Sequence, residues 1–129
     1  MLRTGILNPA LLDLIARTRH TNTLVIADRG FPSWPQIETV DISPVDNVPT
    51  VAQVLDAILP NFVVGRAWMA GEFAQHNGDA AREAIAARLG GARLEFEAHI
   101  DFKKRVPHAI GLIRTGDTTQ YANIILESA

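Results

Sequence analysis

The chain has 129 residues, of which 47% are apolar and 20% are charged, and its net charge is −2. This length suits one domain, and the apolar content is that of a globular protein rather than a disordered one. The balanced charge offers no basic surface for nucleic acid or an anionic membrane. The chain has no cysteine, which excludes disulfides, thiolate zinc sites and a cysteine nucleophile.

The first twenty residues mix apolar side chains with arginines and Asp13. They therefore lack the unbroken apolar segment of a secretory signal. No stretch approaches the ~20 apolar residues of a membrane span. We expect a cytoplasmic protein.

The first predicted elements are a helix and a strand. Asn8 and Pro9 predict the start of the helix, because Asn caps free amides and Pro fits the first helical position. The apolar residues that follow recur at helical spacing. The segment TLVIA, residues 23–27, predicts a buried strand that ends at Asp28.

Helix-like and strand-like segments continue to alternate along the chain. Thr50 predicts the cap of a second helix that ends before Pro60. The expected elements after the first strand are a strand over 37–40, the helix after Thr50, a strand over 62–70, a helix over 79–89, a strand over 93–98, a helical turn over 101–105 and strands over 109–114 and 121–126. This alternation predicts one α/β domain over residues 1–129, with three layers, a mostly parallel sheet and helices on both faces. The short connection between the last two strands predicts a C-terminal antiparallel hairpin.

Polar side chains gather at one edge of this predicted sheet. Asp28, Glu72 and His99 follow the ends of three strands, and the hairpin would bring Tyr121 and Asn123 to the same edge on a shared face. Ligands of open α/β sheets bind beyond the carboxyl ends of the strands. A carboxylate, an imidazole, a phenol and an amide suit a polyhydroxylated ligand such as a sugar, because each can hydrogen-bond a hydroxyl.

Each of these residues also has a simpler structural interpretation. Asp28 can cap the glycine turn that follows it, and His99 can cap the helical turn after it. Tyr121 can be a core aromatic with its hydroxyl at the surface. Glu72 is most simply a solvated loop charge. Asn123 is harder to explain in this way, because a buried amide between apolar neighbours needs partners.

His20 differs from the other candidates in its position. It lies between the first helix and the first strand, at the amino edge of the sheet. Taken alone, it is best explained as a residue favoured by the dipole at a helix C-terminus.

Other chemistries have little support in the sequence. No histidine pair has metal-ligand spacing, and no glycine motif for phosphates follows a strand. No serine has the context of a nucleophile elbow. We therefore expect no metal and no cofactor.

Two long segments, GILNPALLDLIARTRHTNTLVIADRGFP (residues 5–32) and RTGDTTQYANIIL (residues 114–126), carry a family resemblance. They resemble the opening and closing blocks of the D-ribose pyranase and L-fucose mutarotase family. The segments VPTVAQVLDAIL and EFEAHIDFKK fall between them in the expected order. The specific combination is a His eight residues before an Asp, then Gly-Phe-Pro, then a late Tyr-x-Asn, and the resemblance covers essentially the whole chain.

The resemblance implies a cofactor-free isomerase that interconverts cyclic forms of a free monosaccharide. The favoured reaction is D-ribose β-pyranose to β-furanose, and the alternative is an L-fucose-type mutarotase acting on anomers. An alternative of another class is a non-catalytic sugar-binding or transport-accessory protein. By this resemblance the proton donor is His20, and the sugar-binding residues are Asp28, His99, Tyr121, Ala122 and Asn123.

The sequence departs from the family pattern at two places. Arg29 stands where a small residue is expected, and Thr21 and Asn22 replace a more usual Gly-Asp. Both places adjoin proposed site residues, so the choice of sugar stays open.

The resemblance also implies ring-shaped homo-oligomers, commonly decamers, with sites between subunits. Geometry leads to the same expectation. A strand rises about 3.3 Å per residue, so the five residues between Asn22 and Asp28 separate the two edges by roughly 13 Å. If His20 and Asp28 serve one sugar, His20 comes from a neighbouring subunit in a closed ring.

Overall fold

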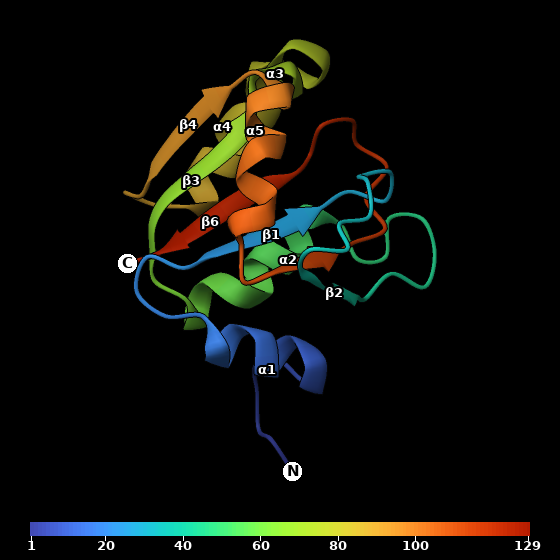
Figure 1. Ribbon diagram of the computed structural model, residues 1–129, viewed down its shortest axis with the longest axis vertical. Helices are drawn as coiled ribbons and strands as arrows, with labels where there is room; N and C mark the ends of the chain where they lie inside the picture. The colour runs from blue at the N-terminus through green and yellow to red at the C-terminus, as the bar shows by residue number, and fades with distance from the viewer.

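The computed structural model describes residues 1–129, which fold around one six-stranded sheet. The strands lie in the order β2-β5-β1-β6-β3-β4 across the sheet (Figure 1). Their bounds are Thr23–Ala27 (β1), Glu38–Asp41 (β2), Val64–Ala70 (β3), Arg93–Glu97 (β4), Gly111–Arg114 (β5) and Ile124–Ser128 (β6). The helices are Pro9–Arg17 (α1), Val51–Ile58 (α2), Gly71–Asn77 (α3), Asp79–Arg88 (α4) and His99–Arg105 (α5), with short 3₁₀ turns at Leu59–Asn61 (η1) and Val106–His108 (η2).

Five strands share one direction and β6 runs against them. β1 and β2 pair in parallel with β5, and β3 pairs in parallel with β4. β6 is antiparallel to both of its neighbours, β1 and β3. The prediction of a mostly parallel sheet is therefore confirmed.

The predicted C-terminal hairpin is wrong. β5 and β6 do not pair, because β1 lies between them. The composition of β6 explains its central place: Ile124, Ile125 and Leu126 are fully buried. Such a strand needs apolar partners on both faces, and pairing on both edges leaves none of its backbone groups unsatisfied.

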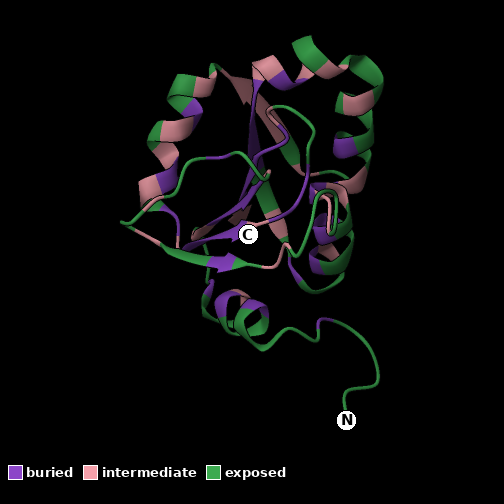
Figure 2. Cartoon of the chain, turned by 90° about the vertical axis from the view of Figure 1, so that its right-hand side faces the viewer, coloured by how far each residue is buried: buried purple, intermediate pink, exposed green.

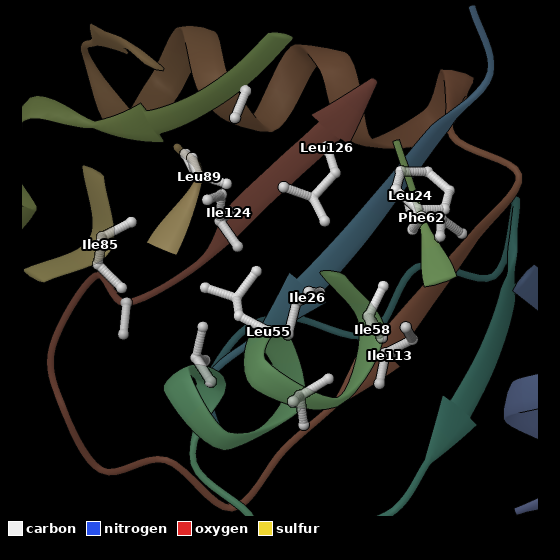
Figure 3. Packing of buried hydrophobic residues seen from close by; sticks show 14 of the residues in the cluster. Leu24, Ile26, Leu55, Ile58, Phe62, Ile85, Leu89, Ile113, Ile124 and Leu126 are labelled. Carbon is white, nitrogen blue, oxygen red and sulfur yellow. The ribbon is translucent and has the colours of Figure 1, made fainter. Parts of the chain in front are cut away.

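Helices cover both faces of the sheet, as the sequence predicts. Residues such as Leu24 and Ile26 point to one face, where they join a core with α1, α2, α3 and α4. The alternate residues of β1 join a second core on the other face, built around Phe102 in the middle of α5 and Val106 just after its end. Figure 1 shows α5 in front of the sheet and α2 and α4 behind it. Figure 2 shows buried residues concentrated in the central strands, with helices around them that carry both buried and exposed residues. Figure 3 shows the larger core in detail.

Local capping signals placed two helices correctly. The Asn8 side chain accepts a hydrogen bond from the Leu11 amide at the start of α1. Thr50 and Gln53 form a reciprocal capping box at the start of α2. These bonds satisfy amides that would otherwise have no partner in the first turn of each helix.

The sequence did not predict α3. This helix follows β3 directly, its N-cap residue Ala70 makes no capping bond through a side chain, and Gly78 ends it with a φ of 86°. The expected helical turn over 101–105 is also longer, since α5 begins at His99. None of these helices is both long enough and apolar enough to cross a membrane.

Candidate functional site

A cavity of about 390 Å³ opens beyond the carboxyl ends of β1 and β5. Its volume lies in the range of small-molecule sites. It contains four of the six site residues expected from the sequence, and its full lining is Asp28, Arg29, Gly30, Phe31, Pro32, His99, Asp117, Thr118, Thr119, Gln120, Tyr121 and Asn123. The lining is mainly polar, as a ligand rich in hydroxyl groups requires.

Asp28 and Asn123 are joined by two hydrogen bonds. The Asn123 amide Nδ2 donates to Asp28 Oδ2 at 3.1 Å, and the Asp28 backbone N–H donates to Asn123 Oδ1 at 2.8 Å. The other carboxylate oxygen of Asp28 accepts from the Gly30 amide at 2.9 Å. Asp28 therefore has both roles considered for it: it caps the glycine turn and it lines the cavity.

Burial raises the pKa of the Asp28 carboxyl above its usual range. The hydrogen bonds from Gly30 and Asn123 oppose this shift, because they stabilise the ionised form. The carboxylate is thus held near the cavity in a partly desolvated setting.

His99 is the first residue of α5 and its ring lies among three aromatic rings. The ring centroids of Phe31 and Phe102 are each 6.1 Å away, and that of Tyr121 is 5.1 Å away, edge-on. Its Nδ1 atom is buried and has no hydrogen-bond partner. Burial, followed by the charge of Lys103, lowers the pKa of His99, so the imidazole is neutral at pH 7 and keeps one donor and one acceptor nitrogen.

Tyr121 and Asn123 line the cavity from a loop, not from the strand face that the sequence predicts. The last strand begins at Ile124, so both residues lie in the preceding loop and do not share a strand face. Tyr121 has a left-handed backbone with a φ of 58°, a conformation that interrupts an extended chain. The side chain of Ala122, between them, is buried and does not line the cavity.

His20 does not lie in the cavity. It is exposed after α1, and the next residue, Thr21, donates its amide to Ser128 O at the far end of β6. His20 and Asp28 therefore lie at opposite edges of the sheet, as expected from the sequence.

Two carboxylates at the cavity, Glu72 outside its lining and Asp117 within it, have roles that the sequence did not reveal. Glu72, expected to be a solvated charge, accepts the His99 backbone N–H with both oxygens, at 3.0 and 3.1 Å. Asp117 is 6% exposed and accepts from the amides of Val51 and Thr119. It thereby ties the loop before Tyr121 to the first turn of α2.

Arg29, which departs from the family pattern, lies at the rim of the cavity. Its guanidinium Nη1 donates to both carboxylate oxygens of Asp46 at 2.8 Å. No group of three or more His, Asp or Glu side chains is arranged to hold a metal ion.

The lowered pKa of His99 gives a testable prediction. Replacing Lys103 with Gln removes a nearby positive charge, so we expect the pKa of His99 to rise toward its ordinary value of 6.5. The matched control is Lys104→Gln, because Lys104 is paired with Asp101 at 2.9 Å and does not contribute to the shift. The pKa is measured by NMR titration of the imidazole ring.

The sign of the accompanying stability change follows from linkage. His99 accepts a proton less readily in the folded chain than in the unfolded chain, so the free energy of unfolding should fall as the pH drops below about 6.5. Lys103→Gln should weaken that dependence. An unchanged His99 pKa in Lys103→Gln would contradict the assignment of the charge effect to Lys103.

Comparison with known proteins agrees with this architecture. The model of the RbsD / FucU transport protein family matches residues 1–129. A D-ribose pyranase of Geobacillus kaustophilus is 41% identical over 128 residues, which cover 99% of this chain and 93% of that protein. The structure of Bacillus subtilis RbsD complexed with D-ribose has a TM-score of 0.93 at 29% identity, and the match covers 100% of this chain and 98% of that chain.

A fucose mutarotase of Streptococcus pneumoniae, solved with L-fucose, has a TM-score of 0.74 at 23% identity, with 95% of this chain and 92% of that chain covered. Likeness at that identity shows the shared fold alone. The family model that matches the whole chain and the 41% identity to a D-ribose pyranase show more than the fold. They confirm the resemblance carried by the opening and closing blocks: this chain belongs to the RbsD / FucU transport protein family.

Proposed function

We propose that this protein interconverts cyclic forms of a free monosaccharide, D-ribose β-pyranose to β-furanose, without metal or cofactor. The observation that carries the proposal is the polar cavity in which Asp28, His99, Tyr121 and Asn123 meet. The match to a D-ribose pyranase, 41% identical and covering 99% of this chain, supports ribose as the substrate.

The cavity residues supply the hydrogen bonds that a sugar ring needs. Asp28 offers carboxylate oxygens, the neutral His99 offers one donor and one acceptor, and the Tyr121 hydroxyl and the Asn123 amide offer both. Ala122 takes part only through its backbone, because its side chain is in the core. We assign sugar binding to these five residues.

The reaction requires two proton movements. Opening the ring removes the proton from the anomeric hydroxyl and delivers a proton to the ring oxygen as the ring C–O bond breaks. Closure through a different hydroxyl reverses both steps and gives the other ring size. We assign the donor role to His20, since histidine exchanges protons near neutral pH. A positioned acid or base accelerates such a step by roughly 10²–10⁴-fold.

His20 can act on a sugar in the cavity only if it comes from another subunit. The cavity lies at the carboxyl edge of the sheet, whereas His20 precedes β1 at the amino edge. A head-to-tail contact between the amino edge of one subunit and the carboxyl edge of the next is heterologous, and it forms a ring when the rotation from subunit to subunit closes. We therefore propose a cyclic homo-oligomer with shared sites, a decamer as the family resemblance implies.

Two alternatives are separated by the same assay. A fucose-type mutarotase would exchange the anomers of L-fucose in preference to the ring forms of D-ribose. A transport-accessory protein would bind sugar without accelerating exchange. The description of the family as a transport protein family favours this alternative.

The cytoplasmic location stays a prediction.

The catalytic proposal is tested by NMR saturation transfer between cyclic forms of D-ribose and L-fucose. We expect the protein to accelerate exchange of D-ribose, and His20→Ala and His20→Gln to lose most of that rate while D-ribose affinity changes only a few-fold, because a donor acts on the transition state. Gln keeps polar character and size but cannot donate a proton at pH 7. Exchange no faster than in the protein-free control would remove the enzyme proposal, and full activity in both variants would return His20 to a role at the helix end.

The shared site is tested by mixing two inactive variants. His20→Ala and Asp28→Ala chains are unfolded together and refolded, so that subunits assort at random. About a quarter of the sites should then combine a wild-type His20 with a wild-type Asp28 from different chains, and activity should return to that extent. Sites built within one chain would recover nothing, and a monomer in solution would equally rule out the ring.

A further inference from the structure

We infer that α3 (Gly71–Asn77) is the positioning element of the proposed sugar site. Glu72 binds the backbone of His99, Asn77 binds the backbone just before Tyr121, and His76 contacts the Tyr121 ring. None of the three lines the cavity. The inference rests on the proposed function, because it concerns rings to which that proposal assigns sugar binding.

Glu72 fixes the backbone of His99. The N-cap residue of α5, Ala98, makes no capping bond through a side chain, so the first amide of the helix needs an acceptor from elsewhere. Glu72 supplies it with both carboxylate oxygens. The parallel pairing of β3 and β4 sets Ala70 opposite Glu97, and two residues beyond each lie Glu72 and His99.

Asn77 fixes the backbone just before Tyr121. Its Nδ2 donates to Phe73 O at 2.9 Å within α3 and to Gln120 O at 2.8 Å in the site loop. Tyr121 has a φ of 58°, and a bulky residue keeps such a conformation only when its surroundings hold it. Asn77 holds the residue before Tyr121, and the bonds of Asn123 to Asp28 hold the segment after it.

His76 contacts the side chain of Tyr121. Its ring centroid lies 4.9 Å from that of Tyr121. The His76 Nδ1 atom lies 3.0 Å from Glu72 O in the preceding turn, which places a hydrogen on Nδ1 and fixes the ring orientation. Tyr121 thus packs against one histidine from α3 and against His99 from α5.

The experiment uses the fact that Tyr121 is the only tyrosine in the chain. Incorporation of 3-fluorotyrosine gives one ¹⁹F resonance, which reports directly on this ring. We expect Asn77→Ala and His76→Ala to shift or broaden the resonance in the absence of sugar. The matched control is Gln75→Ala, because Gln75 is exposed on the same helix, and it should leave the resonance unchanged.

A kinetic cycle shows whether Asn77 acts through Tyr121. We expect Asn77→Ala to lower kcat/KM for D-ribose about tenfold, mainly through KM, and to have less than a twofold effect when Tyr121→Ala is already present. Glu72→Gln keeps an acceptor for the His99 amide, so it should retain more activity than Glu72→Ala.

The outcomes separate the two proposals. An unshifted resonance in Asn77→Ala, or an equal loss of activity with and without Tyr121→Ala, overturns the positioning role. If the wild-type protein converts no sugar, the proposed function fails while the ¹⁹F comparison still decides the positioning. Should Asn77→Ala not fold, the exposed His76→Ala variant carries the same resonance test and the same cycle.

Discussion

The mutual hydrogen bonds between Asp28 and Asn123 are the contact on which the cavity depends. The two residues are 95 positions apart, and each supplies a partner that the other needs. Asn123 is 2% exposed, and leaving a buried amide without partners costs about 1–3 kcal/mol. The pair fixes the end of β1 beside the start of β6, so that the turn at Gly30 and the ring of Tyr121 border one cavity.

The reversed direction of β6 makes this pair possible. Because β6 runs against β1 and β3, its first residues lie at the edge where those strands end. The loop before β6, the turn after β1 and the helices after β3 and β4 all meet there. The helix α3 holds the backbone at His99 and just before Tyr121 and contacts the Tyr121 ring. The same topology leaves His20 at the opposite edge, which explains why the proposed reaction needs a second subunit.

The sequence predicted what short-range signals determine. The cap at Asn8, the capping box at Thr50 and the buried strand that ends at Asp28 depend on near neighbours, and the structure has all three. The place of β6 depends on strands that are distant in the sequence. The short connection between β5 and β6 predicted that these two strands pair, whereas β6 pairs with β1 and β3. Glu72 was missed for the same reason, since its partner is 27 residues away.

The hydrogen bonds between the Asp28 carboxylate and the Asn123 amide hold the site together, and exchanging the two side chains tests this directly. Asn123→Asp alone sets two carboxylates against each other, whereas Asp28→Asn with Asn123→Asp restores a donor opposite each acceptor and leaves acceptors for the amides of residues 28 and 30. The measurement is the thermal unfolding midpoint of both single variants and the double variant at one protein concentration. A double variant more stable than either single variant and close to the wild type is the predicted result, with a coupling of about 0.5–3 kcal/mol. A double variant whose loss of stability equals the sum of the losses of the two single variants would contradict this coupling between Asp28 and Asn123.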